Sequence, residues 1–396
     1  MGHPLRGAAA ITGLGMTPMG RIYKSTMELA ADATRAALDD AGLKKDQVDG
    51  LLINAGITGT TGGGLTLSLQ NYLGMKDLRL LNHMNAAGST AAQMVQYAAM
   101  AIQAGMANHV LCVFADAPLR EGSSAGAAYG SAAANPQRPR GMPGLYAAAG
   151  YFGANTPYAL AARRHMAEYG TTQDQLGIIA VGQRQWAMKS PIAQMRDPMT
   201  LDDYHASRWI IEPLHLLDCC LVSNGAVAVI VSSAGAAKEM PQPPVYVLGM
   251  GQGHPGDSNR AGDDWETRTG ARFAAGTAYK MAGVGPGEID ICQVYDCYTY
   301  TVLVTLEDYG FCKKGEGGPF VQDGKLGPGG SLPTNTGGGE LSGYYMWGMT
   351  PLSEGIIQAR GQGGARQVAK RDTVLVTGNG GSLSYHACLI LSPHGN

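Results

Sequence analysis

Ala41-Gly42-Leu43 and, after four further residues, Val48-Asp49 form the stretch that decides the fold, because it recurs as Ala282-Gly283-Val284 and Ile289-Asp290. In each copy an Ala-rich helical pattern leads into the glycine, and an apolar strand pattern follows. A glycine just beyond a helical pattern is typical of a helix C-terminus. A unit of this size that occurs twice predicts two similar α/β halves.

The repeat continues beyond this unit. Ile102-Gln103-Ala104 precedes the apolar segment 110–113, and Ile357-Gln358-Ala359 precedes the apolar segment 374–376. Ligand sites in proteins built from two such parts tend to lie in the crevice between them. We therefore expect the functional residues to gather in that crevice.

The composition is that of a large globular protein. The chain has 396 residues, of which 45% are hydrophobic and 15% are charged, and its net charge is −2. This hydrophobic content excludes disorder, and the lack of a basic run makes nucleic acid or an anionic membrane a poor candidate partner. No apolar run approaches the ~18 residues of a membrane-spanning helix, and the first residues lack the apolar region of a signal peptide.

The seven cysteines are scattered along the chain. Neither Cys-x-x-Cys nor His-Glu-x-x-His occurs, so no metal site is expected here. Scattered cysteines without a secretory signal indicate reduced thiols, and we therefore expect a cytoplasmic protein. The vicinal pair Cys219-Cys220 lies in an apolar run and is expected in the core.

Apolar segments and helical patterns alternate along the chain. Ser25 and Glu28 form a capping-box pattern that opens a helix, and Gly42 ends it. The predicted strands are 8–15, 49–54, 110–114, 226–232, 245–249, 289–294, 373–377 and 385–392. The other predicted helices are 88–105, 156–169, 172–189, 272–282 and roughly 343–359.

Residues 116–210 have no counterpart in the second half, and we predict that they form an inserted loop domain that covers the site. The N-terminal half then comprises residues 1–115 and 211–240, and the C-terminal half comprises residues 241–396. Helices on both faces of the sheets predict a five-layered αβαβα architecture of the α/β class. Gly249, Gly251 and Gly253 do not have the spacing of a dinucleotide-binding loop.

Several longer motifs carry a resemblance to a known family. They are Arg163-Arg164-His165-Met166, Glu168-Tyr169-Gly170-Thr171-Thr172, Leu217-Asp218-Cys219-Cys220, Ser223-x-Gly225-Ala226 and Tyr295-Asp296-Cys297-Tyr298. Taken in this order, they resemble the thiolase superfamily over nearly the whole chain, in the branch of sterol-carrier-protein-x thiolases and lipid-transfer thiolase-like proteins. The resemblance implies a thiolase-like fold, CoA thioester substrates and a homodimer.

All four catalytic groups of a thiolase are replaced in this chain. The resemblance places Asn85 in the slot of the nucleophilic cysteine and Tyr295 in the slot of the histidine of His-Asp-Cys-Phe. It places Gly343-Tyr344-Tyr345 in the Gly-His-Pro slot and Gly378-Asn379-Gly380 in the Cys-x-Gly slot. Because a carboxamide is not a useful nucleophile, thiolysis through an acyl-enzyme is not expected.

The chemistry that survives is the stabilisation of a thioester enolate. Such an enolate arises in the retro-aldol cleavage of a β-hydroxyacyl-CoA, which needs a base for the hydroxyl proton and an acid for the carbanion. We predict Tyr295 and Tyr344 in these two roles, in either order. The adjoining Tyr298 and Tyr345 are alternatives for the same roles.

Other residues are candidates for binding the substrate. Backbone amides at Asn85 and Gly380 are expected to hold the thioester oxygen. His254 follows a strand end near the expected crevice and is a candidate substrate contact. Arg163 and Arg164 either meet CoA phosphates or face solvent.

Tyrosines in these slots resemble those of the steroid side-chain aldolases of bacterial sterol and bile-acid catabolism. That resemblance implies a 17-hydroxy steroid with a CoA-thioester side chain as substrate, and a 17-ketosteroid and a short acyl-CoA as products. It also implies a complex with a DUF35 protein, an OB-like domain with a zinc ribbon. CoA is then part of the substrate, this chain holds no cofactor, and zinc is expected only in the partner.

Two other functions remain open. One is an acyltransferase or thiolase with an unusual nucleophile, for which Ser89 and Cys297 are candidates. The other is a catalytically inactive thiolase fold that serves as a scaffold or lipid-binding subunit, which the loss of all four groups favours. The polar aromatic residues in two of the four slots favour the aldolase.

Overall fold

The computed structural model describes residues 2–56, 65–125, 141–151, 153–256 and 267–395. Its centre is a nine-stranded mixed sheet with the order β3-β2-β4-β7-β1-β8-β11-β10-β9. The strands are β1 (Ala9–Met16), β2 (Gly50–Ala55), β3 (Leu80–His83), β4 (His109–Asp116), β7 (Gly225–Ser233), β8 (Val245–Gly253), β9 (Ile291–Gln293), β10 (Val374–Gly380) and β11 (Tyr385–Ser392). The two halves meet where β1 pairs with β8 through Ala10–Tyr246 and Ile11–Val245.

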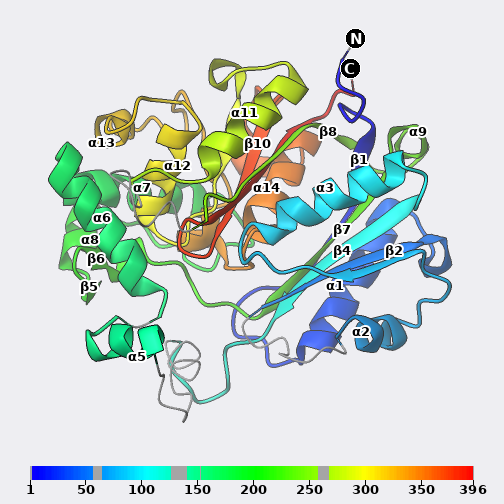
Figure 1. The fold of residues 1–396 in the computed structure, drawn as a ribbon, viewed down its shortest axis with the longest axis horizontal. Coiled ribbons are helices and arrows are strands. Elements are labelled where there is room, and N and C mark those ends of the chain that lie inside the picture. The colour runs from blue at the N-terminus through cyan, green and yellow to red at the C-terminus, as the bar shows by residue number, and fades with distance from the viewer. Residues whose placement is uncertain (1, 57–64, 126–140, 152, 257–266, 396) are drawn as a thin grey trace.

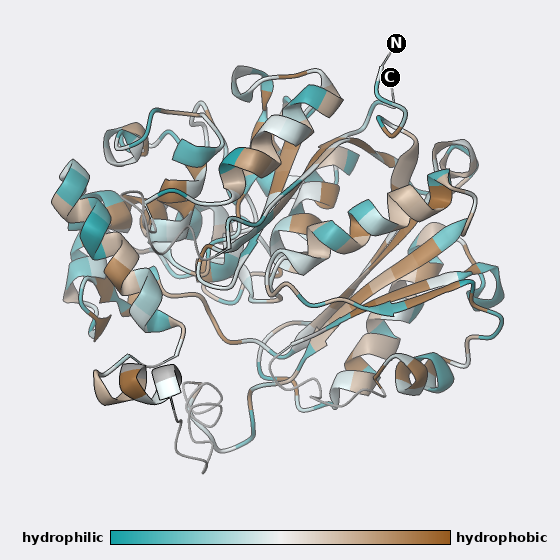
Figure 2. Cartoon of the chain, viewed as in Figure 1, coloured by the Kyte–Doolittle hydropathy of each residue, from teal (hydrophilic) through white to brown (hydrophobic). Residues whose placement is uncertain are grey.

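Helices lie on the outer side of each half of the sheet and also between the two halves, which gives the predicted five layers (Figure 1). Helices α1 (Thr26–Ala41) and α2 (Leu65–Leu73) pack on the outer face of the first half. Helices α3 (Thr90–Gln103) and α14 (Met349–Arg360) lie between the halves, and α11 (Ala271–Ala282) and α12 (Thr299–Asp308) cover the second half. The long strands are largely hydrophobic, whereas the outer helices carry both kinds of residue (Figure 2). The α/β five-layered prediction is confirmed.

The glycine-rich repeat reflects the same close helix-to-strand packing in both halves. A Cβ atom built on Gly13 of β1 would lie 3.0 Å from the Cβ of Ala41 in α1. A Cβ atom built on Gly249 of β8 would lie 3.0 Å from the Cβ of Ala282 in α11. In each half, a glycine in the strand and an alanine at the end of the helix let the two backbones approach closely.

Both helices of the repeat end where the sequence predicts. Gly42 and Gly283 follow α1 and α11 with φ angles of 66° and 71°, in the left-handed region that glycine adopts without strain. At the start of α1 the Ser25 hydroxyl accepts a hydrogen bond from the Glu28 amide, and the Glu28 carboxylate accepts one from the Ser25 amide. The predicted capping box is thus confirmed.

Two predicted boundaries are wrong. Strand β8 continues to Gly253, so its three glycines lie in a strand that packs closely on α11. Helix α14 begins at Met349, because residues 339–343 form a π-helical turn and Trp347 has a φ angle of 49°, outside the helical region. This later start places Tyr344 and Tyr345 in the turn ahead of the helix.

The segment between β4 and β7 is mainly helical and packs beside the second half (green in Figure 1). Its described elements are α5 (Gly141–Ala148), α6 (Asn155–Tyr169), α7 (Gln173–Ala187), α8 (Leu201–Ala206), β5 (Trp209–Ile211) and β6 (Leu214–His215). Short helices α9 (Ala234–Ala237) and α13 (Gly317–Phe320) lie outside it. The domain boundaries stay a prediction. Within the described ranges, no helix has both the length and the apolar character needed to cross a bilayer.

Candidate active site

A cavity of about 750 Å³ lies where the inserted segment meets the C-terminal half. Its wall is mostly apolar. Asn155 and Tyr158 of α6 line it, as do Tyr295 and Tyr298, which follow β9. Tyr345 lines it from the turn ahead of α14. The cavity therefore collects aromatic side chains from parts of the chain that are distant in sequence.

Two phenol groups meet in this cavity. The hydroxyl oxygens of Tyr295 and Tyr345 lie 3.0 Å apart, and either can donate the hydrogen bond. The backbones of both residues are fixed, because the amide of Tyr295 donates to the Thr377 hydroxyl at 3.3 Å and that of Tyr345 donates to the Ser223 hydroxyl at 3.0 Å. The pair is thus held between β10 and the segment that leads into β7.

The surroundings of Tyr295 keep its proton in place. Its side chain is buried, and burial raises the pKa of Tyr295 well above its usual range, whereas the hydrogen bond to Tyr345 acts in the opposite direction. A phenol whose pKa is raised is a proton donor at neutral pH. Any chemistry at this pair must therefore avoid a lasting tyrosinate.

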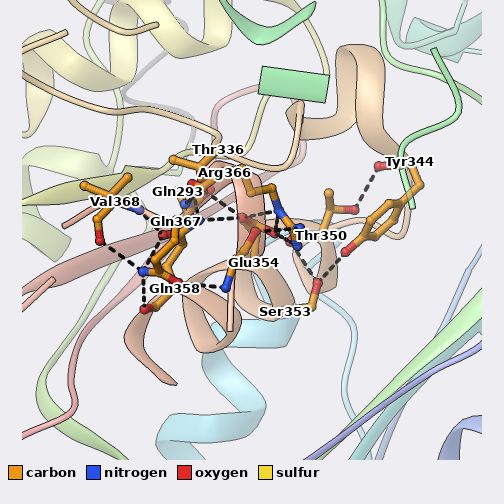
Figure 3. A network of polar contacts seen from close by, with 11 residues as sticks. Gln293, Thr336, Tyr344, Thr350, Ser353, Glu354, Gln358, Arg366, Gln367 and Val368 are labelled. Atoms are coloured by element: carbon orange, nitrogen blue, oxygen red, sulfur yellow. Dashed lines mark hydrogen bonds and ion pairs between the residues drawn. The ribbon is translucent and has the colours of Figure 1, made fainter. Parts of the chain in front are cut away.

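Tyr344 lies elsewhere, so the structure does not bring it together with Tyr295. Its hydroxyl lies 2.7 Å from the hydroxyl of Ser353 on α14, inside a buried polar network (Figure 3). The backbone of Tyr344 is extended, with φ −159° and ψ 162°, and consecutive side chains on an extended segment point to opposite sides. Tyr345, which was the alternative, therefore faces the cavity in its place.

The turn ahead of α14 repeats the turn ahead of α3. Ala87 and Trp347 both have a φ angle of 49°, and both line the cavity. The hydroxyls of Thr90 and Thr350 accept hydrogen bonds from the amides four residues before them, at 2.7 and 2.9 Å. The two turns are therefore equivalent positions of the internal repeat.

This equivalence pairs Tyr345 with Asn85, the residue in the cysteine slot. Asn85 is exposed and does not line the cavity. Its side-chain oxygen accepts a hydrogen bond from the Ala87 amide at 3.1 Å, which is a local turn contact. In the sequence, aligning the two turns of the internal repeat pairs Asn85 with Tyr345. This alignment is the signal that favours Tyr345 over Tyr344.

Gly380 and Gly88 bring β10, α3 and Tyr295 into contact. Gly380 lines the cavity, and a Cβ atom on it would lie 2.6 Å from the main-chain oxygen of Ala86 and 3.2 Å from the nitrogen of Gly88. A Cβ atom on Gly88 would overlap the ring of Tyr295. The ring of Tyr295 thus lies against the turn that opens α3, where the helix dipole favours negative charge.

Gly88→Ala is expected to lower kcat by about tenfold or more, because the new methyl group overlaps both the Tyr295 ring and the main-chain oxygen of Asn379. The ring must move, and its displaced hydroxyl then misses its partner. Steady-state kinetics would measure the loss. Gly276→Ala, at an exposed site where a Cβ atom meets nothing within 4 Å, is the control for a glycine substitution away from the cavity. Equal activity of Gly88→Ala and wild type would show that the ring position is unimportant.

The remaining predicted contacts do not line the cavity. His254 is exposed. Arg163 lies 3.8 Å from Glu212 in a largely exposed ion pair, and Arg164 lies 3.4 Å from Glu168 in a partly buried one. The parts of the chain that the structure describes contain no group of three His, Cys, Asp or Glu residues suited to a metal ion.

The structure gives the two alternative nucleophiles little reactivity. Ser89 is fully buried, and its hydroxyl donates to the main-chain oxygen of Ala86 at 2.8 Å. Cys297 lines the cavity, but burial raises the pKa of its thiol well above the usual range, so the thiolate is scarce. Neither residue is equipped to form an acyl-enzyme.

A buried histidine lies beside the former Cys-x-Gly segment. His386 of β11 is opposite Asn379 of β10 in the strand register, is fully buried, and has no hydrogen-bond partner among the described residues. Burial lowers the pKa of His386 to about 3. The folded state therefore binds fewer protons than the unfolded state once the pH falls below about 6.5.

His386→Asn is expected to flatten the pH dependence of stability on the acid side. The neutral His386 contributes stability that is complete above about pH 6.5 and is lost as the pH falls toward 3. In this range the free energy of unfolding of the wild type, measured in urea, should fall by about 1.4 kcal/mol per pH unit more than that of the variant. Parallel curves for the two proteins would contradict the burial of an uncharged histidine.

Several residues of the cavity wall have no signal in the sequence. Arg184 and Trp347 line the cavity, and no pattern in the sequence separates them from ordinary helix and turn residues. Tyr298, named only as an alternative, donates to Asn155 at 2.5 Å and its ring lies 4.5 Å from that of Tyr158. These contacts depend on how the insertion folds over the second half.

The five-layered fold is that of a thiolase-like protein. The slot of the nucleophilic cysteine, in the turn ahead of α3, holds Asn85. Residues 251–393 match the family model described as "Thiolase C-terminal domain-like". The chain is 37% identical to the steroid side-chain-cleaving aldolase of Thermomonospora curvata, over 95% of this chain and 96% of that protein. It is 34% identical to the 17-hydroxy-3-oxo-4-pregnene-20-carboxyl-CoA lyase of Mycobacterium tuberculosis, over 95% and 97%.

A solved structure, the Ltp2-ChsH2(DUF35) aldolase, superposes with a TM-score of 0.86 and 34% identity over 98% of this chain and 99% of that chain. The chain belongs to the thiolase superfamily, and within it to the family that contains the steroid side-chain-cleaving aldolases. The resemblance of the motifs quoted above to this branch is thus confirmed.

Proposed function

We propose that this protein is a carbon–carbon lyase that cleaves a β-hydroxyacyl-CoA by a retro-aldol reaction, without a covalent acyl-enzyme. The observation that carries the proposal is the pair of phenol hydroxyls 3.0 Å apart in a large, mostly apolar cavity, in a chain that has Asn85 in place of the nucleophilic cysteine. Retro-aldol cleavage needs proton transfers but no nucleophile.

The two tyrosines are proposed to act as a proton relay. As the bond between the α- and β-carbons breaks, the substrate hydroxyl gives its proton to the oxygen of Tyr345, and Tyr345 passes its own proton to Tyr295. Tyr295 protonates the α-carbon that received the electron pair. Each phenol gains one proton as it loses one, so no tyrosinate forms, in agreement with the raised pKa of Tyr295.

Negative charge develops on the thioester oxygen as the carbon–carbon bond breaks, and this oxygen requires hydrogen-bond donors. The turn that opens α3 and the end of β10 at Gly380 adjoin the Tyr295 ring, and both reach the cavity wall. Backbone amides in these turns are proposed to stabilise this negative charge. Removing one such donor typically lowers kcat about 10²–10³-fold. Asn85 is proposed to shape this turn through its contact with the Ala87 amide.

The substrate is proposed to carry a bulky hydrocarbon skeleton such as a steroid. The cavity volume of about 750 Å³ and its apolar wall suit such a group. The names of the two relatives in Thermomonospora curvata and Mycobacterium tuberculosis support the same substrate class. A ketone and a short acyl-CoA would then be the products.

The protein is proposed to work in a complex. The likeness to the Ltp2-ChsH2(DUF35) aldolase supports a DUF35 partner, which would supply any zinc. A homodimer of this chain is proposed as the core of the complex, as the resemblance to thiolases implies. CoA enters only as part of the substrate. Since all seven cysteines are free thiols, a reducing cytoplasm is the proposed location.

A product assay tests the function. The protein and its DUF35 partner would be incubated with a 17-hydroxy steroid CoA thioester without added free CoA. The proposal predicts equal amounts of ketone and acyl-CoA. A strict requirement for free CoA would indicate thiolysis, and no turnover with the partner present would favour a scaffold or lipid-binding subunit.

A further inference from the structure

Arg184 of α7 is a buried cation in the wall of the cavity. Arg184 is only 5% exposed, and it is one of the residues that line the cavity. Among the described residues that line the cavity, Arg184 and the exposed Arg208 are the only charged ones, and no carboxylate accompanies them. Both charged side chains of this wall are therefore cations, although the chain as a whole has a net charge of −2.

The partners of Arg184 are neutral. Its Nε donates to the hydroxyl of Ser342 at 3.0 Å, and its Nη1 donates to the main-chain oxygen of Asp197 at 3.1 Å. The other two buried arginines of the described chain differ in this respect. Arg360 and Arg366 each lie within 2.9 Å of a carboxylate oxygen.

A buried cation without an anion is costly, and evolution usually provides a counter-charge. Burial lowers the pKa of Arg184, and the carboxylate of exposed Asp197 only partly offsets this effect. A guanidinium has five N–H donors, and two of them are used here. The nitrogen Nη2 makes neither of these two bonds, and it is not among the fully buried polar atoms that lack a partner, so it keeps some accessible surface.

A purely structural role accounts for only part of this arrangement. Ser342 belongs to the turn of residues 339–343 that precedes Tyr345, so Arg184 does hold the insertion to that turn. However, two neutral acceptors do not require a full charge. The unused N–H donors and the positive charge of the guanidinium would be matched if a negatively charged or polarised group of a ligand entered the cavity.

We propose that Arg184 is a substrate-binding residue whose guanidinium receives a negatively polarised oxygen of the acyl-CoA substrate inside the cavity. The identity of that substrate rests on the proposed function. Such an oxygen can come from the CoA portion, through a phosphate or an amide carbonyl, or from the acyl portion, through its carbonyl groups. In both cases the contact is a charge-assisted hydrogen bond.

Isothermal titration calorimetry can test this contact without any turnover. The probes are CoA alone, the steroid ketone alone, and an acyl-CoA that lacks the β-hydroxyl and so cannot be cleaved. The variants are Arg184→Gln, Arg184→Lys, and Arg163→Gln as a control for an exposed arginine outside the cavity. Circular dichroism establishes that each variant is folded.

Arg184→Gln should bind the unreactive acyl-CoA about tenfold more weakly or worse, Arg184→Lys should recover part of the loss, and Arg163→Gln should stay within about twofold of wild type. An equal loss with CoA places the oxygen in the CoA portion, and an equal loss with the ketone places it in the skeleton. A loss seen only with the acyl-CoA places it at the thioester.

Unchanged affinity of Arg184→Gln for the acyl-CoA would overturn the proposal and leave Arg184 as a positioning residue for the turn before Tyr345. This result is separate from a failure of the aldolase. A wild-type protein that binds the acyl-CoA through Arg184 but never cleaves its substrate would refute the proposed function only.

Discussion

Replacing Tyr295 or Tyr345 by phenylalanine should reduce kcat at least ~100-fold, the usual contribution of a general acid or base. Each change removes one hydroxyl from the pair that lies 3.0 Å apart and so interrupts the relay, but it keeps the aromatic ring in the cavity wall. Steady-state assays of ketone release, with the DUF35 partner present, measure the effect. KM should change much less than kcat.

Tyr344→Phe is the matched control for this pair. Its hydroxyl is bound to Ser353 and lies outside the cavity, so the variant should keep most of its activity and lose only about 1 kcal/mol of stability. A large loss of kcat in Tyr344→Phe together with near-normal rates in Tyr345→Phe would restore the assignment made from the sequence. Normal rates in Tyr295→Phe would exclude the relay altogether.

Arg366→Met should destabilise the folded protein by about 3–5 kcal/mol, because it leaves a buried carboxylate without its cation. Arg366 holds Glu354 of α14 through Nε at 2.9 Å and Nη2 at 3.0 Å, and both residues are buried (Figure 3). Thr336 and Gln358 bond to the same carboxylate at 2.8 and 3.0 Å. Urea unfolding of the variant and wild type gives the difference.

Arg163→Met serves as the control for this prediction. The Arg163–Glu212 pair is 3.8 Å apart and mostly exposed, so its loss should cost less than about 1 kcal/mol. Similar losses for the two variants would mean that the buried network does not hold α14 in place. The turn before α14, with Tyr345 on it, would then need another support.

The architecture could be predicted because its determinants are local in sequence. Gly42 and Gly283 end helices through their own φ angles, and the Ser25–Glu28 capping box involves residues three positions apart. The antiparallel pairing of β1 with β8 at the centre of the sheet could not be predicted from the sequence. It joins Ala10 to Tyr246, which are distant in the chain, and no local pattern marks the pair.

The candidate site was predicted in part. Tyr295 and Gly380 do line the cavity, because each sits at the end of a strand whose position the repeat defines. Tyr344 was preferred to Tyr345 because the resemblance places it in the histidine position of the Gly-His-Pro slot. A shift by one residue on extended backbone reverses the side-chain direction. Arg184 was missed because periodicity predicts that a helix face is buried but not what it faces.

Intact-protein mass spectrometry during turnover distinguishes a proton relay from an acyl-enzyme. The protein, its partner and a β-hydroxyacyl-CoA substrate would be quenched in acid while ketone is being released. We expect a chain of unmodified mass throughout, because Tyr295 and Tyr345 move protons and no side chain carries the acyl group. A fraction of the chain heavier by the mass of the acyl group, formed and lost at the rate of turnover, would contradict it.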